Sequence, residues 1–260
     1  MATIGAYVIN MDGARERWQL MEGQLDALGL PYERFAAIDG KALGGTHPDF
    51  SALSYRLMHG RRFIPGEIGC YLSHVGALKA FLASGHDHAL VLEDDVVIDP
   101  RTPALIEAAI AAGTWDILRL STVNSGRKHA YLPLSADHDL AIALTREKGA
   151  GAYVVTRRGA EWMAGMLPIR MAWDIAFDTE YLHGLRTAFI VPVPCDQNTG
   201  MATQIQNSIR KYKLPSWRYL TVFPVRAFLE TSRLVVRSAR LASLRLSHRG
   251  RPDEGRPVTP

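Results

Sequence analysis

Residues 4–39, IGAYVINMDGARERWQLMEGQLDALGLPYERFAAID, decide the fold class. Residues 4–9 are a short apolar run of the kind that forms a buried strand. Asp12 and Gly13 then form a turn or a helix N-cap, and Gly29 is well placed to end the helix that follows. The apolar residues of this helix recur at helical spacing: Trp18, Met21, Leu25 and Leu28. Residues 31–39 resume as a strand, so the order strand, helix, strand predicts an α/β fold.

Alternating strands and helices continue along the chain. A second helix is predicted to begin near Pro65 and to run to about Ala83, before an apolar strand that starts near residue 88. Further strands are expected at 115–120, 151–156 and 187–194, and helices at 103–112 and 157–167. The prolines in 187–194 indicate that part of this strand lies at a sheet edge. Residues 40–64 read as loop with at most one short helix, and 121–146 carry no clear pattern.

Composition limits the classes of protein that this chain can be. Its 260 residues are 47% hydrophobic and 22% charged, which is typical of a folded enzyme. Cys70 and Cys195 form neither a zinc pattern nor a disulfide framework, which favours a reducing compartment. The N-terminus lacks the features of a secretory signal, and no apolar run reaches the length of a membrane span. These observations together predict a cytoplasmic protein.

Positive charge is concentrated at the C-terminal end. Residues 226–260 contain eight arginines and three acidic residues, a net charge of +5, which leaves −1 for residues 1–225 out of the total of +4. We therefore expect one catalytic or binding domain at 1–225 and a basic C-terminal tail at 226–260. Within the tail, Arg233, Arg237 and Arg240 recur at helical spacing between apolar residues, which favours a basic amphipathic helix.

Such a helix can lie on an anionic membrane surface, where each arginine contributes about 1 kcal/mol. We therefore expect peripheral association with the inner face of the membrane through residues 226–250. The alternatives are a helix packed on the domain and a disordered tail; the last twelve residues are expected to be disordered. No nucleic-acid partner is expected, because the tail lacks the interleaved aromatic residues that stack on bases.

Three consecutive acids interrupt an apolar stretch in residues 88–100, HALVLEDDVVIDP. Glu93, Asp94 and Asp95 follow the buried part of a strand, at the sheet end where α/β proteins bind their ligands. Burying three like charges is costly unless a cation compensates them. Carboxylate oxygens suit Mg²⁺ or Mn²⁺ bound together with a diphosphate. The alternative is an acidic turn without a ligand.

Five blocks of the sequence resemble glycosyltransferase family 25, the lipooligosaccharide galactosyltransferase group related to the collagen galactosyltransferases. They are YVINMDGARERWQLMEGQLDALGLPYERFAAIDG, GEIGCYLSHVGALKAF, LVLEDDVVI, GAGAYVVTRRGAEWM and MAWDIAFD, in order over about residues 4–180. The resemblance implies a GT-A-type nucleotide-binding fold, with a central mostly parallel sheet flanked by helices. It also implies metal-assisted, inverting transfer of a hexose, usually galactose, from a UDP-sugar to a bacterial surface glycan.

Within this resemblance, the acidic triplet corresponds to the family's metal-binding element. Asp95 is then the metal ligand, for Mn²⁺ or Mg²⁺, while Glu93 and Asp94 support the donor ribose or the metal. The segment CDQNTGMATQIQNSIRK after the last predicted strand matches the family only loosely, so the acceptor is not identified. A catalytically weak sugar-nucleotide-binding or glycan-assembly protein of the same fold is the main alternative.

Further candidates lie in the same blocks. Glu67 and His74 share one face of the second long helix with Cys70 and could contact donor or acceptor, or simply pack. Asn10 and Arg15 follow the first strand, where the nucleotide is expected, although the Asp12 region could instead cap the helix. Arg17, by contrast, is interpreted as a solvated helix residue.

An inverting transfer needs one general base to deprotonate the attacking acceptor hydroxyl. Asp174 matches the family block best and is the predicted base, with Asp178 and Glu180 as alternatives in the same segment. Asp174 could instead cap the start of a helix.

Overall fold

The computed structural model describes residues 2–124, 126–197 and 209–248. Its first elements are β1 (Ile4–Asn10), α1 (Arg15–Ala27) and β2 (Tyr32–Ala36), so the predicted strand, helix, strand order is confirmed. β1 and β2 pair in parallel, with Ala6 opposite Tyr32, as expected when a helix connects two neighbouring strands of one sheet.

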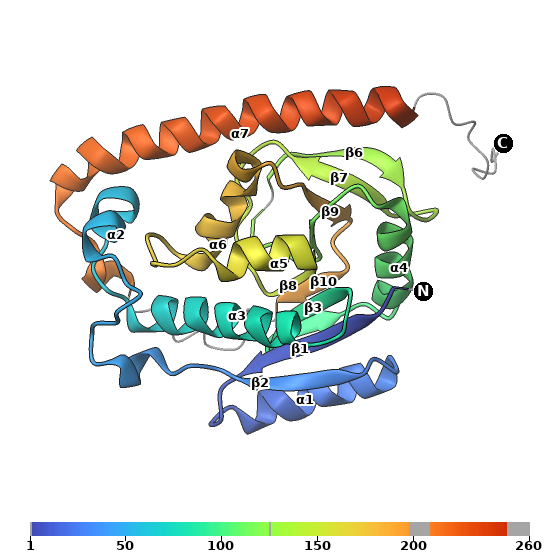
Figure 1. The fold of residues 1–260 in the computed structure, drawn as a ribbon, viewed down its shortest axis with the longest axis horizontal. Coiled ribbons are helices and arrows are strands. Elements are labelled where there is room, and N and C mark those ends of the chain that lie inside the picture. The colour runs from blue at the N-terminus through green and yellow to red at the C-terminus, as the bar shows by residue number, and fades with distance from the viewer. Residues whose placement is uncertain (1, 125, 198–208, 249–260) are drawn as a thin grey trace.

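Eight strands form the central sheet, in the order β2-β1-β3-β8-β5-β9-β7-β6 (Figure 1). The remaining members are β3 (His88–Glu93), β5 (Ile117–Arg119), β6 (Lys128–Pro133), β7 (Asp139–Ala143), β8 (Ala152–Thr156) and β9 (Thr187–Val191). The pairings of these strands make β8 and β7 antiparallel to their neighbours, while the other six strands point the same way. The predicted α/β architecture with a mostly parallel sheet is therefore confirmed.

Helices cover both faces of this sheet. α3 (Pro65–Ala83) packs against α5 (Arg157–Ala164) on one face, over a core that includes Tyr7, Val91 and Tyr153. α1 and α4 (Thr102–Ala112) enclose the second core, to which the alternate residues of the same strands contribute, such as Val8 and Leu92. Because neighbouring strand residues face opposite sides, a strand buried on both faces has to be apolar throughout.

Three regions differ from the sequence-based prediction. Residues 121–146, which carry no clear pattern, contain the β6–β7 hairpin, and 40–64 contain both η1 (Gly40–Leu43) and α2 (Ala52–His59). β9 lies inside the sheet between β5 and β7, so its predicted edge position is wrong; the strand ends at Val191, and both prolines follow it. β4 (Val96–Ile98) leaves the acidic triplet and pairs with β10 (Cys195–Gln197) in a separate two-stranded sheet.

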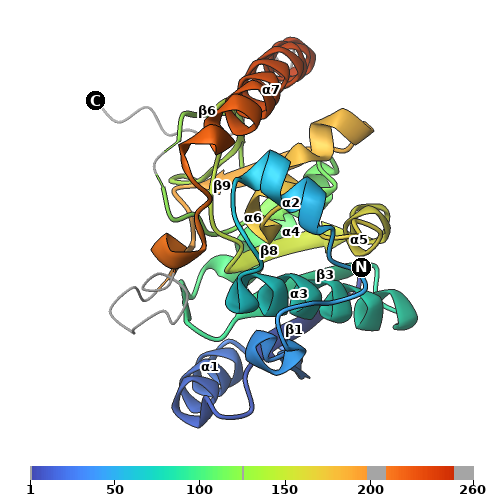
Figure 2. The ribbon, with the colours of Figure 1, turned by 90° about the vertical axis from the view of Figure 1, so that its left-hand side faces the viewer.

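The C-terminal helix α7 (Tyr219–His248) follows the short turns η3 (Ile209–Tyr212) and η4 (Ser216–Arg218). Figures 1 and 2 show α7 along one side of the molecule, beside α2 and the β6–β7 hairpin, with α1 on the opposite side. The predicted boundary between residues 225 and 226 falls inside this helix, and residues 249–260 lie outside the described part of the chain. None of the described helices is both long and apolar enough to cross a membrane.

Arg233, Arg237 and Arg240 of α7 point toward the domain, which corrects the predicted arrangement with these arginines facing a membrane. Arg237 is 2% exposed and donates hydrogen bonds to Asp178 and Glu180, both on η2 (Phe177–His183). Arg240 donates to the carbonyl of Thr187. The physical reason is that Asp178 and Glu180 are buried, and a buried carboxylate requires a cation at hydrogen-bond distance.

Replacing Arg237 with methionine should therefore lower the free energy of unfolding by about 3–5 kcal/mol, because Asp178 and Glu180 would lose their buried cation. Urea unfolding measures this change. The matched control is Arg245→Met on the same helix, where an exposed arginine bonds only the Ala130 carbonyl and the change should stay below about 1 kcal/mol. Equal effects of the two substitutions would contradict the assigned role of Arg237.

Candidate active site

The acidic triplet forms the turn between β3 and β4. Glu93 is the last residue of β3, and Asp94 and Asp95 make the turn before Val96. The chain does turn here, but it does not return the acids to water: Asp94 is only 9% exposed, and neither Glu93 nor Asp95 is fully exposed. Three carboxylates therefore lie together in a partly desolvated place at the end of a buried strand.

Asp94 is held by residues that come from the first strand and helix. Asn10, at the end of β1, donates a hydrogen bond of 2.6 Å to Asp94, and Arg17 of α1 forms an ion pair with it at 3.0 Å. Burial raises the pKa of Asp94, although Asn10 and Arg17 act in the opposite direction. The pairing of Arg17 corrects its interpretation as a solvated residue. Arg15 is exposed and makes no side-chain contact with the triplet within the described residues.

Asp95 has weaker support: the charge of Arg17 and a backbone hydrogen bond lower its pKa, but they do not outweigh its burial. Its Oδ1 is buried and has no hydrogen-bond partner anywhere in residues 2–124, 126–197 and 209–248. Burial, followed by the charges of Glu93 and Asp94, raises the pKa of Asp95 from 3.8 to about 6. A buried carboxylate oxygen that lacks a donor is a position where a cation stabilises the folded chain.

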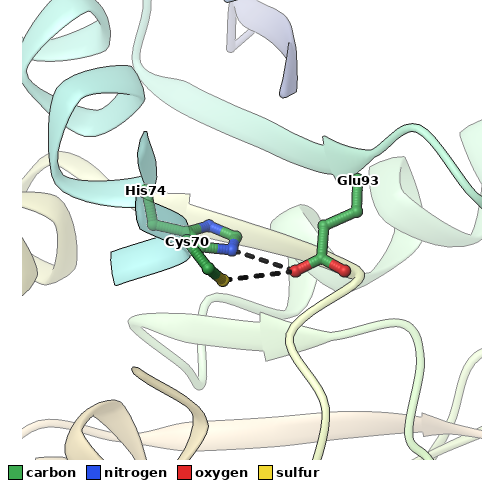
Figure 3. Close-up of side chains that lie close together, drawn as sticks. All are labelled: Cys70, His74 and Glu93. Carbon is green, nitrogen blue, oxygen red and sulfur yellow. Dashed lines mark hydrogen bonds and ion pairs between the residues drawn. The ribbon is translucent and has the colours of Figure 1, made fainter. Parts of the chain in front are cut away.

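Glu93 points toward Cys70 and His74 of α3, as Figure 3 shows. Its Oε1 lies 3.2 Å from His74 Nε2 and 3.9 Å from the Cys70 Sγ. The other ring nitrogen of His74 lies 3.1 Å from the Tyr153 hydroxyl, and the imidazole stacks on Trp173 with an interplanar angle of 8°. The orientation of His74 is therefore fixed by polar contacts at both ring nitrogens and by stacking of the ring on Trp173.

Two positions near the triplet offer ligands to a metal. The ligand atoms of Cys70, His74 and Glu93 lie within 4.8 Å of one another, a set with nitrogen and sulfur that suits zinc. Cys70 and His74 both already contact Glu93 at hydrogen-bond distance, however, so this set needs no ion. Oδ1 of Asp95 lacks a hydrogen-bond partner among the described residues, and its oxygen chemistry suits Mg²⁺ or Mn²⁺. We therefore favour Asp95 as the metal ligand.

Glu67 lies one turn before Cys70 on α3 and is occupied by its neighbours. It accepts hydrogen bonds from Tyr55 and Arg61, and His59 Nε2 lies 3.4 Å away. Burial would raise the pKa of Glu67, but the contacts with His59, Arg61 and Tyr55 outweigh burial and lower it. Glu67 is thus held ionised and is poorly suited to accept a proton at neutral pH.

Asp174 lies in the first turn of the short helix α6 (Trp173–Ala176), whose N-cap is Ala172, so Asp174 does not cap the helix. Burial raises the pKa of Asp174, while the charges of Arg119 and Arg146 and a backbone hydrogen bond from Gly149 limit the rise. A partly buried carboxylate with a raised pKa has the properties expected of a general base.

The charges of acids from three separate blocks act on the thiol of Cys70. Burial raises the pKa of this thiol, and the next largest causes are the charges of Glu93, Asp174, Glu67 and Asp95. These acids therefore lie near enough to one side chain of α3 for their charges to affect it. Asp178 and Glu180, the alternative bases, lie with Arg237 and hold α7 instead.

Arg119 is a residue of this region that sequence reasoning missed. It is 1% exposed, lies over the rings of Phe177 and Phe189, and contributes a positive charge that opposes the raised pKa of Asp174. The sequence does contain an indication of this role. Residues 115–120, WDILRL, place Arg119 between apolar residues of a predicted strand, where a buried charge requires a partner.

Comparison with known families places this geometry in context. The sequence profile described as "Glycosyltransferase family 25 (LPS biosynthesis protein)" matches residues 3–177. The chain belongs to glycosyltransferase family 25. The matched region contains all the acids around Cys70 and stops within η2, before α7. The family assignment made from the sequence blocks is thus confirmed.

Relatives within family 25 are distant. A "Glycosyltransferase 25 family member" from Aedes aegypti is 32% identical over 43% of this chain and 20% of its own length. A "Putative glycosyltransferase" from Haemophilus influenzae is 24% identical over 68% of this chain and 64% of its own. "Procollagen galactosyltransferase 1" from Danio rerio is 25% identical over 63% and 29% respectively. The chain thus spans about a fifth of the length of the insect relatives.

A solved structure is also similar to this chain. It is a glycosyltransferase involved in glycosylation of the major capsid of PBCV-1, with 10% identity and a TM-score of 0.42, covering 86% of this chain and 99% of that one. This similarity is too low to carry information about the site.

The unusual environment of Asp95 predicts a pH-dependent stability. Because its pKa is higher in the folded chain than in the unfolded one, ionised Asp95 destabilises the fold, and stability is lost as pH rises from about 4 through about 6. Asp95→Asn should therefore stabilise metal-free protein by about 2 kcal/mol at pH 7.5, and by much less at pH 4.5.

Urea unfolding in the presence of a chelator measures this difference at both pH values. Asp12→Asn is the control, since the side chain of Asp12 is 83% exposed and should show no such trend. A stabilisation by Asp95→Asn that does not change with pH would contradict the assigned burial of an uncompensated charge.

Proposed function

We propose that this chain is a metal-dependent, inverting glycosyltransferase of GT-A type that moves a hexose from a UDP-sugar to a glycan acceptor. One observation carries the proposal: in a family 25 chain, the buried Oδ1 of Asp95 has no hydrogen-bond partner among the described residues and lies beside two further acids. The charge of the predicted base, Asp174, acts on the same Cys70 thiol as the charge of Asp95. Mn²⁺ or Mg²⁺ fits Oδ1 of Asp95. When bound, such an ion offsets the charge of the donor diphosphate and assists its departure.

The ends of β1 and β3 would hold the donor. Ligands of α/β proteins bind beyond the carboxyl ends of such strands, which is where Asn10, Glu93 and Asp94 lie. Arg17 and Asn10 fix the Asp94 carboxylate, so that it can accept a hydrogen bond from a ribose hydroxyl without reorganising. Arg15 lies exposed on the same helix and would reach the donor only from the surface.

Asp174 would act as the base. In an inverting transfer it removes the proton of the acceptor hydroxyl as the oxygen attacks the anomeric carbon, and the nucleoside diphosphate leaves from the opposite side. Glu67 and His74 would line the same space: Glu67 is kept ionised by Arg61, and His74 holds the Glu93 carboxylate in place. Neither is proposed to transfer a proton.

Galactose is the proposed sugar and a lipooligosaccharide or related bacterial surface glycan the proposed acceptor. The names of the relatives support this choice, since they include procollagen galactosyltransferases and the profile is described as an LPS biosynthesis protein. The rival proposal is a sugar-nucleotide-binding or glycan-assembly protein with little catalytic activity. The two differ in one measurable respect, the release of UDP.

UDP release should be measured with a lipooligosaccharide preparation as acceptor and with UDP-galactose, UDP-glucose or UDP-N-acetylglucosamine as donor, in Mn²⁺, in Mg²⁺ and in a chelator. We expect metal-dependent turnover with UDP-galactose, and a loss of about 10²–10⁴-fold in Asp174→Asn, because the acceptor proton then has no base. Asp139→Asn, at the start of β7 near the other sheet edge, is the control and should keep full activity. Donor binding without UDP release would favour the rival, and full turnover by folded Asp174→Asn would refute the assigned base.

Peripheral membrane association at the cytoplasmic face is also proposed, but by a different surface from the one predicted. Arg233 and Arg237 of α7 face the domain and are buried. Four apolar residues of the same helix are 60–80% exposed: Leu220, Phe228, Val235 and Leu246. Their spacings of eight, seven and eleven residues put them on one face of the helix. An apolar helix face can insert at a membrane interface, and the exposed Lys211 and Lys213 would attract anionic lipids.

The double substitution Phe228→Asp and Val235→Asp should abolish sedimentation with anionic liposomes, because charged side chains oppose insertion of this face. Leu20→Asp is the matched control: Leu20 is 56% exposed on α1, on the opposite side of the molecule from α7 (Figure 1). Equal sedimentation of the double variant and the wild type would rule out α7 as the membrane contact.

A further inference from the structure

A small cavity lies between α2, the segment before α6 and the first half of α7. Its polar lining consists of His59, Arg146, Arg226, Glu230 and Arg233. The volume is about 20 Å³, enough for one water-sized group, so that only an oxygen or two of a larger ligand would enter. Three arginines against one glutamate make this lining strongly cationic.

Two of these arginines make no direct polar contact within the described ranges. Arg146 and Arg226 both line the cavity, and neither guanidinium group makes a hydrogen bond or an ion pair with a described residue, although the charge of Arg146 acts on Asp174. Arg226 is also exposed to solvent. Partial burial lowers the pKa of Arg226, and the nearby charges of Arg146 and Arg61 lower it further. Like charges that share a cavity repel one another, and an anion between them relieves this repulsion.

The third arginine is buried and incompletely hydrogen-bonded. Arg233 is fully buried, and its Nη1 pairs with Glu230 at 2.7 Å. Its Nη2 lies 3.0 Å from Asp178 Oδ2, but poorly aligned, so that Nε and Nη2 both lack a hydrogen-bond acceptor among the described residues. Buried N–H groups without an acceptor are costly and rare, and a ligand oxygen would satisfy them.

The cavity lies next to the proposed base. Ile175, which follows Asp174 in α6, contributes to its lining, and the charge of Arg146 acts on the pKa of Asp174. The donor diphosphate is assigned to the metal ligand Asp95, which does not line the cavity. The charges of Asp95 and Asp174 both raise the pKa of the Cys70 thiol. Arg226 and Arg233 belong to α7, which the family profile does not cover, so this chain can differ here from its relatives.

We propose that Arg146, Arg226 and Arg233 form a subsite for an anionic group of the acceptor, a phosphate or a carboxylate. Guanidinium groups bind both anions with paired, charge-assisted hydrogen bonds. This inference rests on the proposed function, because it takes Asp174 as the base and therefore the cavity as the acceptor side. An acidic acceptor is then held beside the base, and a neutral one binds less tightly.

Inorganic phosphate is the first probe, titrated calorimetrically into the full chain with a chelator present, so that it cannot bind through a metal at Asp95. We expect binding that weakens about tenfold or more in Arg226→Gln and in Arg146→Gln, because each loses a charge-assisted contact. Arg56→Gln is the matched control, an exposed arginine of α2 outside the cavity lining, and should bind as the wild type does. Equal phosphate affinity in all four proteins, or none in the wild type, overturns the subsite.

Two further arms identify the source of the anion. With Mg²⁺ and saturating UDP present, phosphate binding should persist; displacement by UDP would make this a donor site and overturn the acceptor assignment.

Glucose 6-phosphate should bind better than glucose in the wild type but not in Arg226→Gln. Sedimentation with phosphatidylglycerol vesicles should be the same for both proteins, and its loss in Arg226→Gln would assign the site to a lipid headgroup instead of a glycan. Since binding is measured without turnover, a chain inactive with every donor still passes or fails this test.

Discussion

Repulsion among carboxylates is the physical constraint on which the centre of this structure depends. Glu67, Glu93, Asp95 and Asp174 all act on the thiol of Cys70, and Glu93 and Asp94 act on Asp95 within one turn. Each of these acids has a cation or a hydrogen-bond donor nearby; for Asp95 these are the charge of Arg17 and a backbone N–H, yet its pKa stays raised. The buried Oδ1 of Asp95 still lacks a hydrogen-bond partner among the described residues, and a bound cation would offset this destabilising charge.

The same requirement for compensation explains the C-terminal helix. Asp178 and Glu180 are buried beside the proposed site, and Arg237 reaches in from α7 to pair with both. The helix thus directs Arg233 and Arg237 inward beside buried apolar residues such as Leu229, and leaves other apolar residues outside. Packing of α7 in this way also brings Arg226 and Arg233 to the cavity beside α6. The ion pairs of Arg237 with Asp178 and Glu180 therefore support both the fold and the proposed acceptor subsite.

Much of the site was predictable because its residues lie in short, ordered blocks. The acids at the end of β3 could be placed from the apolar run before them, and α3 from its own apolar stripe and Pro65. Arg17 could not be distinguished from Arg15, because both occupy the first turn of α1, and only the orientation of that helix against β1 selects which one reaches Asp94. The β6–β7 hairpin was missed because exposed and buried residues do not alternate along β6.

The sequence by itself determined the α/β class, the position of the acidic triplet and membership of family 25, because these depend on local periodicity and on residues close together in the chain. Only the tertiary structure decided which charges meet. It brought acids from three separate blocks near Cys70 and left Oδ1 of Asp95 without a hydrogen-bond partner among the described residues. It also turned Arg237 toward Asp178 and Glu180. Pairing between residues dozens of positions apart depends on how the elements pack, and periodicity along one helix carries no information about its partner.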